Sequence, residues 1–238
     1  MSYHLEIARN TLEIELAQAF RTNIFRNGRQ FTDADEFDDN CLHFLIFDLS
    51  HSNKLVCVFR VMIISSFTQI KKCYSYQFYK LANLKNVKQP MLELGRFCID
   101  PTYKDPKIIL MAWGALRKLV EKNDIKLLFG CSSFPGTSVE KYLDCFKFLS
   151  LNHLAPRKLG PYVKAPNVFK FNNLLNLNSF CSVKAKKTLP PLLASYLKLG
   201  GWVSNHAVID KDLGTLHVFT GLQVDMIPPK RKLFLQSL

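Results

Sequence analysis

Large apolar side chains recur at every fourth position between residues 12 and 24, which is the spacing of one face of an α-helix. Uninterrupted apolar runs elsewhere in the first third of the chain predict buried strands instead. Asn10 or Thr11 can cap the start of the helix, and Gly28 follows its expected end. The elements predicted here are a strand at Tyr3–Ala8, a helix from Thr11 to Phe25, and strands at Leu42–Phe47 and Leu55–Ile64.

The rest of the chain alternates between the same two patterns. An apolar strand stops at Asp100 and Pro101, and apolar residues at helical spacing follow it. Residues 130–136 are mostly small and predict a turn. The elements predicted here are strands at Met91–Ile99 and Lys126–Phe129, helices at Lys107–Glu121, at Ser138–Leu149 and from Leu189 onward, and a terminal hairpin at Val203–Ile209 and Leu216–Leu222.

This order of elements predicts an α/β (α+β) fold with a mixed central sheet flanked by helices. The pattern changes near Asn152, where prolines at positions 156, 161 and 166 interrupt it. We therefore expect a core domain over residues 1–151 and an extension over residues 152–238. In the extension, a helix and a hairpin are expected to pack on the core.

Composition indicates a folded protein with a basic surface. Hydrophobic residues make up 48% of the 238 residues and charged residues 21%, which excludes a disordered chain. The formal net charge is +13, so the surface attracts nucleic acid, anionic lipid or an acidic protein. The basic clusters at 184–187 and 230–232 are too short for a nucleic-acid-binding tail. We therefore expect no nucleic-acid partner.

Cysteines and apolar stretches bear on the cellular location. The seven cysteines form no C-x-x-C pair and have no histidine at zinc-ligand spacing, so we expect free thiols in a reducing cytoplasm and no metal. The N-terminal residues lack the basic and apolar regions of a signal peptide. The longest apolar stretch, Leu55–Phe67, contains Arg60 and is too short to span a bilayer. Any membrane contact is therefore expected to be peripheral.

Two charged residues, Glu93 and Arg60, lie inside apolar predicted strands. An unpaired carboxylate is costly to bury, so Glu93 is either paired or functional. Two alternatives follow: a structural ion pair with Arg60, or a polar site that crosses the sheet. Arg96 would face away from Glu93 in a regular strand, but a bulge introduced by Gly95 would bring both onto one side.

An acidic stretch carries carboxylates at positions 33, 35, 36, 38 and 39. Such a run is usually a solvated loop, but beside a strand it can clamp an amine. An EF-hand calcium loop is excluded because its glycine and closing glutamate are missing. The segment 130–137 lacks the G-x-S-x-G pattern of a nucleophile turn. Cys131 is therefore expected to be a packed thiol rather than a nucleophile.

Two longer motifs carry a resemblance to a known family. The segments Glu93-Leu-Gly-Arg-Phe-Cys-Ile-Asp-Pro-Thr-Tyr103 and Leu128-Phe-Gly-Cys-Ser-Ser-Phe-Pro-Gly-Thr137, with Trp113 in the helix between them, resemble the ornithine-lipid N-acyltransferases, the hemolysin-like branch of the GNAT superfamily. Segments near Cys41 and Leu189 extend the resemblance over nearly the whole chain. It implies a GNAT-like fold and transfer of a (3-hydroxy)fatty acyl group from acyl carrier protein to the α-amine of L-ornithine, the first step of ornithine-lipid synthesis.

A fainter resemblance to the acyl-homoserine-lactone synthases implies roles for single residues. Glu93 is the candidate base, direct or through water, and Arg96 accompanies it in the catalytic group. Asp35 and Asp38 are expected to hold the side-chain ammonium of the acceptor, and Arg60 or Arg96 its carboxylate, because the arginine fork suits that group. The predicted acceptor-binding residues are Asp35, Asp38, Arg60 and Arg21.

The expected acyl donor follows from a difference between this chain and the GNAT proteins that use coenzyme A. GNAT proteins that use coenzyme A usually carry a Gly-rich pyrophosphate loop where this chain has Lys104-Asp-Pro-Lys107. We therefore expect a phosphopantetheine-linked acyl carrier protein as donor, contacted by Lys104, Lys107 and Ser133, and no bound cofactor. Gln77 and His217 also depart from the family, because acidic residues are usual at both positions.

Two other functions remain open on the sequence. An acyl-homoserine-lactone synthase would release a lactone. A basic membrane- or nucleic-acid-binding module without catalysis has no need of charges inside a central strand, which argues against it. The expected place of action is the cytoplasm, on the inner face of the cytoplasmic membrane, with the anionic membrane surface as a partner besides acyl carrier protein and L-ornithine.

Overall fold

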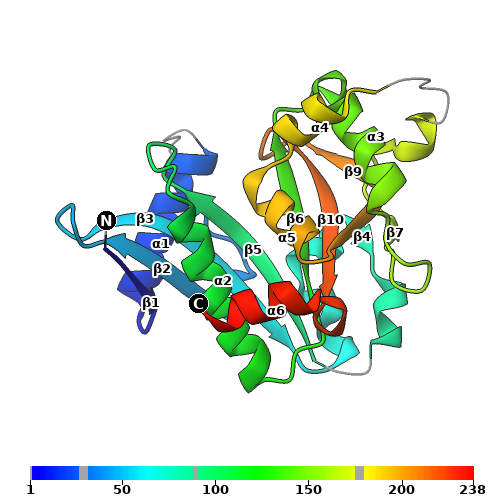
Figure 1. Cartoon of the computed structure of the whole chain (residues 1–238). Helices are drawn as coiled ribbons and strands as arrows, with labels where there is room; N and C mark the ends of the chain where they lie inside the picture. Colours follow the sequence, from blue (N-terminus) through cyan, green and yellow to red (C-terminus); the bar gives the residue numbers. More distant parts are fainter. Residues whose placement is uncertain (1, 27–31, 88–89, 175–179) are drawn as a thin grey trace.

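A computed structural model describes residues 2–26, 32–87, 90–174 and 180–238. Gly28, which was expected to end the first helix, lies outside these ranges. Figure 1 shows the arrangement of the elements. They are β1 (Tyr3–Ile7), α1 (Thr11–Phe25), β2 (Leu42–Asp48), β3 (Lys54–Ile64), β4 (Tyr79–Lys80), β5 (Met91–Ile99), α2 (Pro106–Lys122), β6 (Leu127–Pro135), α3 (Leu143–Asn152), β7 (Tyr162–Val163), β8 (Val168–Lys170), α4 (Ser182–Thr188), α5 (Pro191–Lys198), β9 (Trp202–Asp210), β10 (Thr215–Gln223) and α6 (Pro229–Gln236).

One eight-stranded sheet organises the molecule, in the order β1-β2-β3-β5-β6-β10-β9-β8. β5 and β6 pair in parallel, and the other neighbouring strands of this sheet pair antiparallel. The mixed sheet flanked by helices is the fold that the element order predicted. β9 and β10, which belong to residues 152–238, complete the sheet that the first half of the chain begins.

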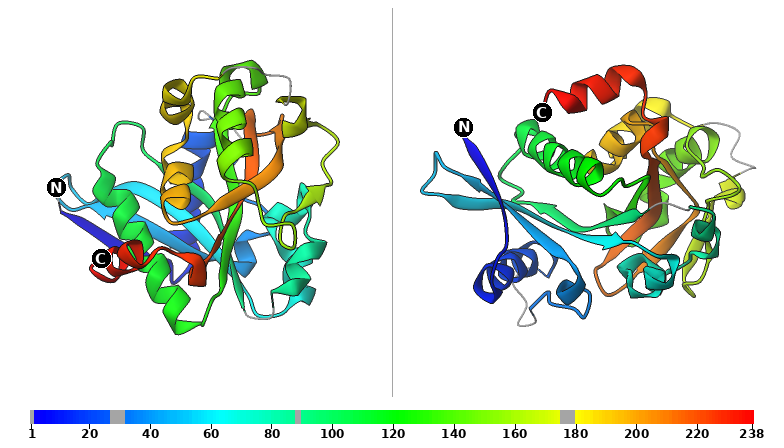
Figure 2. Two further views of the ribbon diagram at one scale, coloured as in Figure 1. Left: turned by 45° about the vertical axis from the view of Figure 1, so that its right-hand side comes forward. Right: turned by 90° about the horizontal axis from the view of Figure 1, so that it is seen from below.

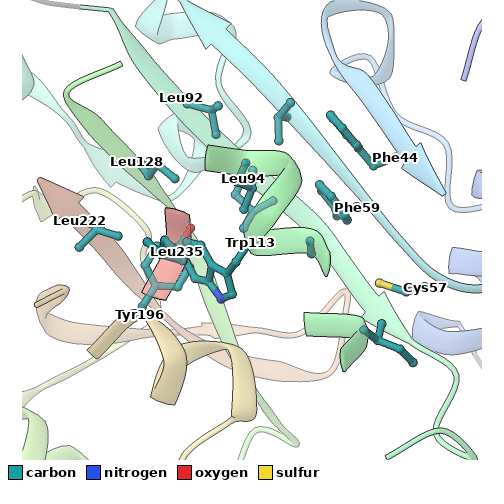
Figure 3. Packing of buried hydrophobic residues seen from close by; sticks show 14 of the residues in the cluster. Phe44, Cys57, Phe59, Leu92, Leu94, Trp113, Leu128, Tyr196, Leu222 and Leu235 are labelled. Atoms are coloured by element: carbon teal, nitrogen blue, oxygen red, sulfur yellow. The ribbon is translucent and has the colours of Figure 1, made fainter. Parts of the chain in front are cut away.

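Helices cover both faces of the sheet (Figure 2). On one face, α2 buries Ile108, Ala112 and Leu116 against the core. The indole N–H of Trp113 donates to Ser195 Oγ at 3.1 Å and so ties α2 to α5. Figure 3 shows this core, with Trp113 close to Tyr196, Leu235 of α6 and the strand leucines. The buried residues of this core are apolar, and several of them are aromatic.

The opposite face is covered by α1 and by short 3-10 turns between residues 67 and 86. Asn10 caps α1 as predicted, because its side chain accepts from the Glu13 N–H at 3.0 Å. The buried positions of α1 are Ala17 and Arg21. A buried arginine on this face needs anionic partners, which the segment after the helix supplies. None of the helices in the described ranges is long and apolar enough to cross a membrane.

The turn predicted at residues 130–136 is wrong, because β6 continues through this segment to Pro135. The segment alternates in the manner of a strand: Ser132 and Phe134 are buried on one face while Ser133 is exposed on the other. β10 pairs along this whole strand, from Thr215 opposite Pro135 to Gln223 opposite Leu127. Pairing with β10, which is distant in the sequence, stabilises this strand, although its small residues are not typical of a strand.

β5 and β6 part in the middle of the sheet. Their register runs from Met91 opposite Leu127 to Leu94 opposite Gly130, and beyond this last pair the two strands diverge (Figure 1). We call this place the β5–β6 split. Gly130 permits the close approach at its apex, because a Cβ there would lie 2.2 Å from the Leu94 carbonyl oxygen.

A β-bulge lies on β5 directly after the β5–β6 split. Val58 faces Cys98 and Arg60 faces Gly95, so two residues of β5, Arg96 and Phe97, oppose one residue of β3. The bulge expected near Gly95 is therefore present. The residue in the left-handed region is Arg96, with a φ of 51°. This strained conformation for a non-glycine residue is held by the contacts of the Arg96 side chain described below.

Substitutions of Gly130 and Gly95 test whether the close approach of β5 and β6 requires a glycine. Gly130→Ala is expected to lower the free energy of unfolding by about 1–3 kcal/mol, because overpacking forces the strands apart. Gly95→Ala is the matched control, since its Cβ would meet nothing closer than 3.8 Å. Urea denaturation of both variants measures the difference. Equal stabilities would contradict the assignment of Gly130 as the close-contact position.

Candidate active site

The carboxylate of Glu93 is buried at the β5–β6 split and is held by backbone N–H groups. Tyr74 N donates to it at 2.9 Å and Ser75 N at 2.7 Å, both from the 3-10 turn Tyr74–Gln77. The Glu93 residue is 6% exposed. Burial raises the pKa of Glu93, although the hydrogen bonds from Ser75 and Tyr74 oppose the shift. The geometry therefore holds a carboxylate that binds a proton more readily than an ordinary one.

The ion pair between Glu93 and Arg60, left open by the sequence, is not formed. Arg60 lies opposite Gly95 in the sheet, whereas Glu93 lies opposite Met62. The Arg60 guanidinium turns to Asp35, with contacts of 2.5 and 2.9 Å. Within the part of the chain that the structure describes, Glu93 takes part in no ion pair.

Asp38 is the buried centre of a charge network beside Glu93. Arg21 binds it with both terminal nitrogens, at 2.9 and 2.7 Å, and Arg60 contacts the same carboxylate. Burial alone would raise the pKa of Asp38, but the hydrogen bonds and charges of Arg21 and Arg60 outweigh it and hold the pKa well below its usual value. Bidentate arginine contacts of this kind fix orientation as well as charge.

Asp33 and Asp35 complete the network through Arg96. Arg96 Nε donates to Asp33 at 3.0 Å, and a terminal nitrogen donates to Asp35 at 2.9 Å. The Asp35 side chain is 20% exposed, whereas those of Asp33 and Arg96 are 1% and 8% exposed. The structure therefore brings together Arg96 and the four residues predicted to bind the acceptor. It adds Asp33, to which the sequence analysis assigned no role.

Tyr74 joins the charge network to Glu93. Its ring lies under the Arg96 guanidinium, 4.6 Å from ring centroid to Arg96 Cζ, while its N–H binds Glu93. Phe37 packs edge-on against the same ring. The bulge at Arg96 thus sets Arg96 and Glu93 on either side of one tyrosine. Sequence analysis missed Tyr74, because the irregular segment around it offered no periodic signal.

β6 and β10 bound the other side of the site. Cys131 Sγ lies 3.5 Å from Ser75 Oγ, and burial raises the pKa of the Cys131 thiol, which agrees with a packed thiol. His217 is buried, with Nδ1 3.0 Å from the Tyr79 hydroxyl. Burial lowers the pKa of His217 to about 3, so this histidine is neutral where the resembled family usually has an acidic residue. Gln77, the other departure, is exposed.

The residues predicted for donor binding lie apart from the charge network. Lys104 and Lys107 are exposed on the loop after β5 and at the start of α2, and Ser133 is exposed on β6. Asp105 caps α2, because its carboxylate accepts from Lys107 N at 2.9 Å. The start of α2 is thus already occupied by an anionic side chain.

An apolar cavity of about 200 Å³ lies elsewhere, between α2, the start of β6, the end of β10 and α6. Leu128 and Leu222 line it, and both point to the α2 face of the sheet. Glu93 lies among the residues of the other face, next to Cys131 and the 3-10 turns. The cavity and the candidate active site are therefore separate features.

Known acyltransferases are similar to this chain in sequence. Residues 17–114, which include the second half of α1, the acidic segment, β5 and the first half of α2, match the acetyltransferase (GNAT) domain family. The chain is 28% identical to an L-ornithine N(alpha)-acyltransferase of Rhodobacter capsulatus over 98% of this chain and 95% of that protein. Three further relatives of the same name are 27–28% identical.

The chain has a GNAT-like fold, and the family match and the named relatives support an N-acyltransferase. The predicted resemblance and fold class are confirmed, and this acyltransferase shares its fold with solved structures of low identity. One is an N-acyl amino acid synthase from uncultured soil microbes, with a TM-score of 0.50 and 11% identity, covering 100% of this chain and 98% of the other. Another is a coenzyme A-dependent acyl-homoserine lactone synthase, with a TM-score of 0.52 and 10% identity, covering 99% and 87%.

Two adjacent aspartates test the charge network of this acyltransferase. Asp38→Asn removes the buried partner of Arg21 and Arg60, and is expected to lower the free energy of unfolding at pH 7 by about 3–5 kcal/mol. Asp39→Asn is the matched control, because Asp39 is exposed, and it is expected to change stability by less than about 0.5 kcal/mol. Urea denaturation at pH 7 gives both values.

The difference between these variants has a definite pH dependence. A depressed pKa in the folded state stabilises the protein above the unfolded-state pKa, and this stability is lost as the pH falls through the folded-state value. The advantage of the wild type over Asp38→Asn should therefore shrink as the pH falls below about 4. A pH-independent difference, or an Asp38→Asn variant as stable as Asp39→Asn, would show that the network contributes little.

Proposed function

We propose that this acyltransferase moves a (3-hydroxy)fatty acyl group from acyl carrier protein to the α-amine of L-ornithine and forms lyso-ornithine lipid. The observation that carries the proposal is the buried Glu93 at the β5–β6 split, in a chain whose four relatives named L-ornithine N(alpha)-acyltransferase align over 93–98% of its length. Glu93 supplies the base, and the neighbouring charge network supplies a site for an amino acid.

The acceptor enters at the exposed end of the charge network. Ornithine brings an ammonium on its side chain and a carboxylate, so it can insert between Asp35 and Arg96 without leaving a net charge. Asp35 is the most exposed acid of the network and binds the side-chain ammonium. Arg96, with Arg60 beside it, binds the carboxylate. Asp38 and Arg21 lie deeper and hold these groups in place.

Glu93 removes a proton from the α-ammonium, directly or through one water. The free amine then attacks the thioester carbon, a C–N bond forms, and the carbonyl oxygen becomes an oxyanion. In this proposal, backbone N–H groups of β5 near the bulge stabilise that charge. Collapse breaks the C–S bond, and the departing thiolate takes up the proton that Glu93 held. The new amide nitrogen then loses its extra proton to Glu93, which releases it to solvent. No covalent enzyme intermediate is needed.

Two features favour acyl carrier protein over free coenzyme A. The loop between β5 and α2 has no glycine, and the Asp105 carboxylate occupies the start of α2, where a pyrophosphate would otherwise bind backbone N–H groups. Lys104 and Lys107 remain exposed beside it and suit the single phosphate of phosphopantetheine. Ser133 lies on the opposite strand of the β5–β6 split and contacts the pantetheine arm.

The experiment is acylation of L-ornithine by the purified protein, with the product identified by mass spectrometry. We expect N-acylornithine, formed at least tenfold faster from 3-hydroxyacyl carrier protein than from the matching acyl-coenzyme A. The rate from the carrier protein should fall as salt rises, because charges on the basic surface are screened over about 8 Å at physiological ionic strength. Acyl-coenzyme A, which relies less on that surface, serves as the internal control.

Two outcomes would contradict different parts of the proposal. Equal or faster use of acyl-coenzyme A would contradict the assignment of the donor. A lactone formed from S-adenosylmethionine, with ornithine left unacylated, would replace the proposed function by that of an acyl-homoserine-lactone synthase.

A further inference from the structure

Four large apolar side chains near the end of the chain are left exposed. Leu233 is 67% exposed, Phe234 42%, Met226 68% and Leu238 38%. Single exposed apolar residues are common on proteins, but here four lie within thirteen positions of the sequence, two of them adjacent on α6. We call α6 together with Met226 and Leu238 the α6 surface.

Packing fixes the orientation of this patch. Leu235 is buried in the core against α2, so α6 is anchored by one side. Lys232 and Gln236 line the apolar cavity beneath the helix. Leu233 and Phe234 therefore face solvent, and Figure 2 shows α6 on the outside of the molecule beside α2.

Positive charge accompanies the exposed apolar residues. Lys230, Arg231 and Lys232 are all exposed. The sequence from Met226 to Leu238 contains no acidic residue. Large apolar side chains interleaved with lysine and arginine are the chemistry that binds an interface between anionic head groups and acyl chains. Each basic residue near such a surface strengthens binding about fivefold.

We propose that the α6 surface docks this acyltransferase on an anionic lipid bilayer. Leu233 and Phe234 enter the boundary between head groups and acyl chains, while Lys230 and Arg231 meet lipid phosphates. The inference deepens the proposed function and rests on it in one respect: an acylated amino acid is an amphiphile that partitions into a membrane. Binding itself requires no catalysis and is tested without it.

A second exposed apolar pair on the chain offers a matched control. Leu12 and Leu16 on α1 are 76% and 44% exposed, but Glu13 and Glu15 accompany them in place of basic residues. Acidic neighbours oppose an approach to anionic lipid. Removal of these leucines should therefore leave binding unchanged, although it removes the same kind of side chain.

The experiment is co-sedimentation of the full-length protein with vesicles of phosphatidylcholine, with or without one third phosphatidylglycerol. We expect the wild type to bind the anionic vesicles at least tenfold more tightly than the neutral ones. Leu233→Ser/Phe234→Ser should weaken anionic binding about tenfold or more, and Lys230→Gln/Arg231→Gln about 25-fold. Leu12→Ser/Leu16→Ser should bind like the wild type.

Acylation of ornithine in a vesicle-free assay is measured on the same preparations and should be unchanged in all three double variants. This readout shows that the variants are folded, and it separates failure of docking from failure of the proposed function. Equal binding to neutral and anionic vesicles, or wild-type binding by both α6 variants, would overturn the proposal. So would a loss of carrier-protein-dependent rate without any loss of vesicle binding, which would assign the α6 surface to an acidic protein partner.

Discussion

The candidate active site is built around one buried carboxylate that has hydrogen bonds but, among the residues that the structure describes, no ion-pair partner. Two peptide N–H groups hold Glu93, and the three arginines nearby are engaged by Asp33, Asp35 and Asp38. If these arginines were free to approach, they would favour the ionised form of Glu93 and lower its proton affinity. Besides their proposed contact with the amino acid, the aspartates therefore keep positive charge away from Glu93. Burial can then raise the pKa of Glu93.

The β5–β6 split opens the sheet beside Glu93. A continuous sheet would separate the α2 face from the face that carries Glu93, but the strands part after the Leu94–Gly130 pair. A thioester can therefore approach from one side and an amine from the other. The bulge at Arg96 lies on the same strand just beyond, so the departure from regular pairing also turns Arg96 toward Asp33 and Asp35, where the acceptor is proposed to bind. Both irregularities serve the site, as backbone strain at functional positions often does.

Sequence patterns predicted most of the elements because apolar spacing reports burial locally. The helices at Thr11–Phe25 and Pro106–Lys122 and the strand at Met91–Ile99 agree with expectation to within about one residue. Glu93 and Arg60 were recognisable because charges inside apolar strands are costly. Their partners were not, since the choice between Asp35 and Glu93 for Arg60 depends on sheet register. Backbone donors such as Tyr74 N have no side-chain signature, and the full length of β6 depends on β10, some 80 residues later.

The most direct test of Glu93 as the base is the pH dependence of kcat/KM for ornithine acylation, measured for the wild type and for Glu93→Gln. The wild-type rate should fall as the pH decreases through the pKa of Glu93, at a pH above the ordinary carboxylate value of 4.5, because the protonated form accepts no proton. Glu93→Gln should lose this limb and run roughly 100-fold slower at neutral pH. A variant with near-normal turnover and an unchanged profile would contradict the account and assign Glu93 to structure alone.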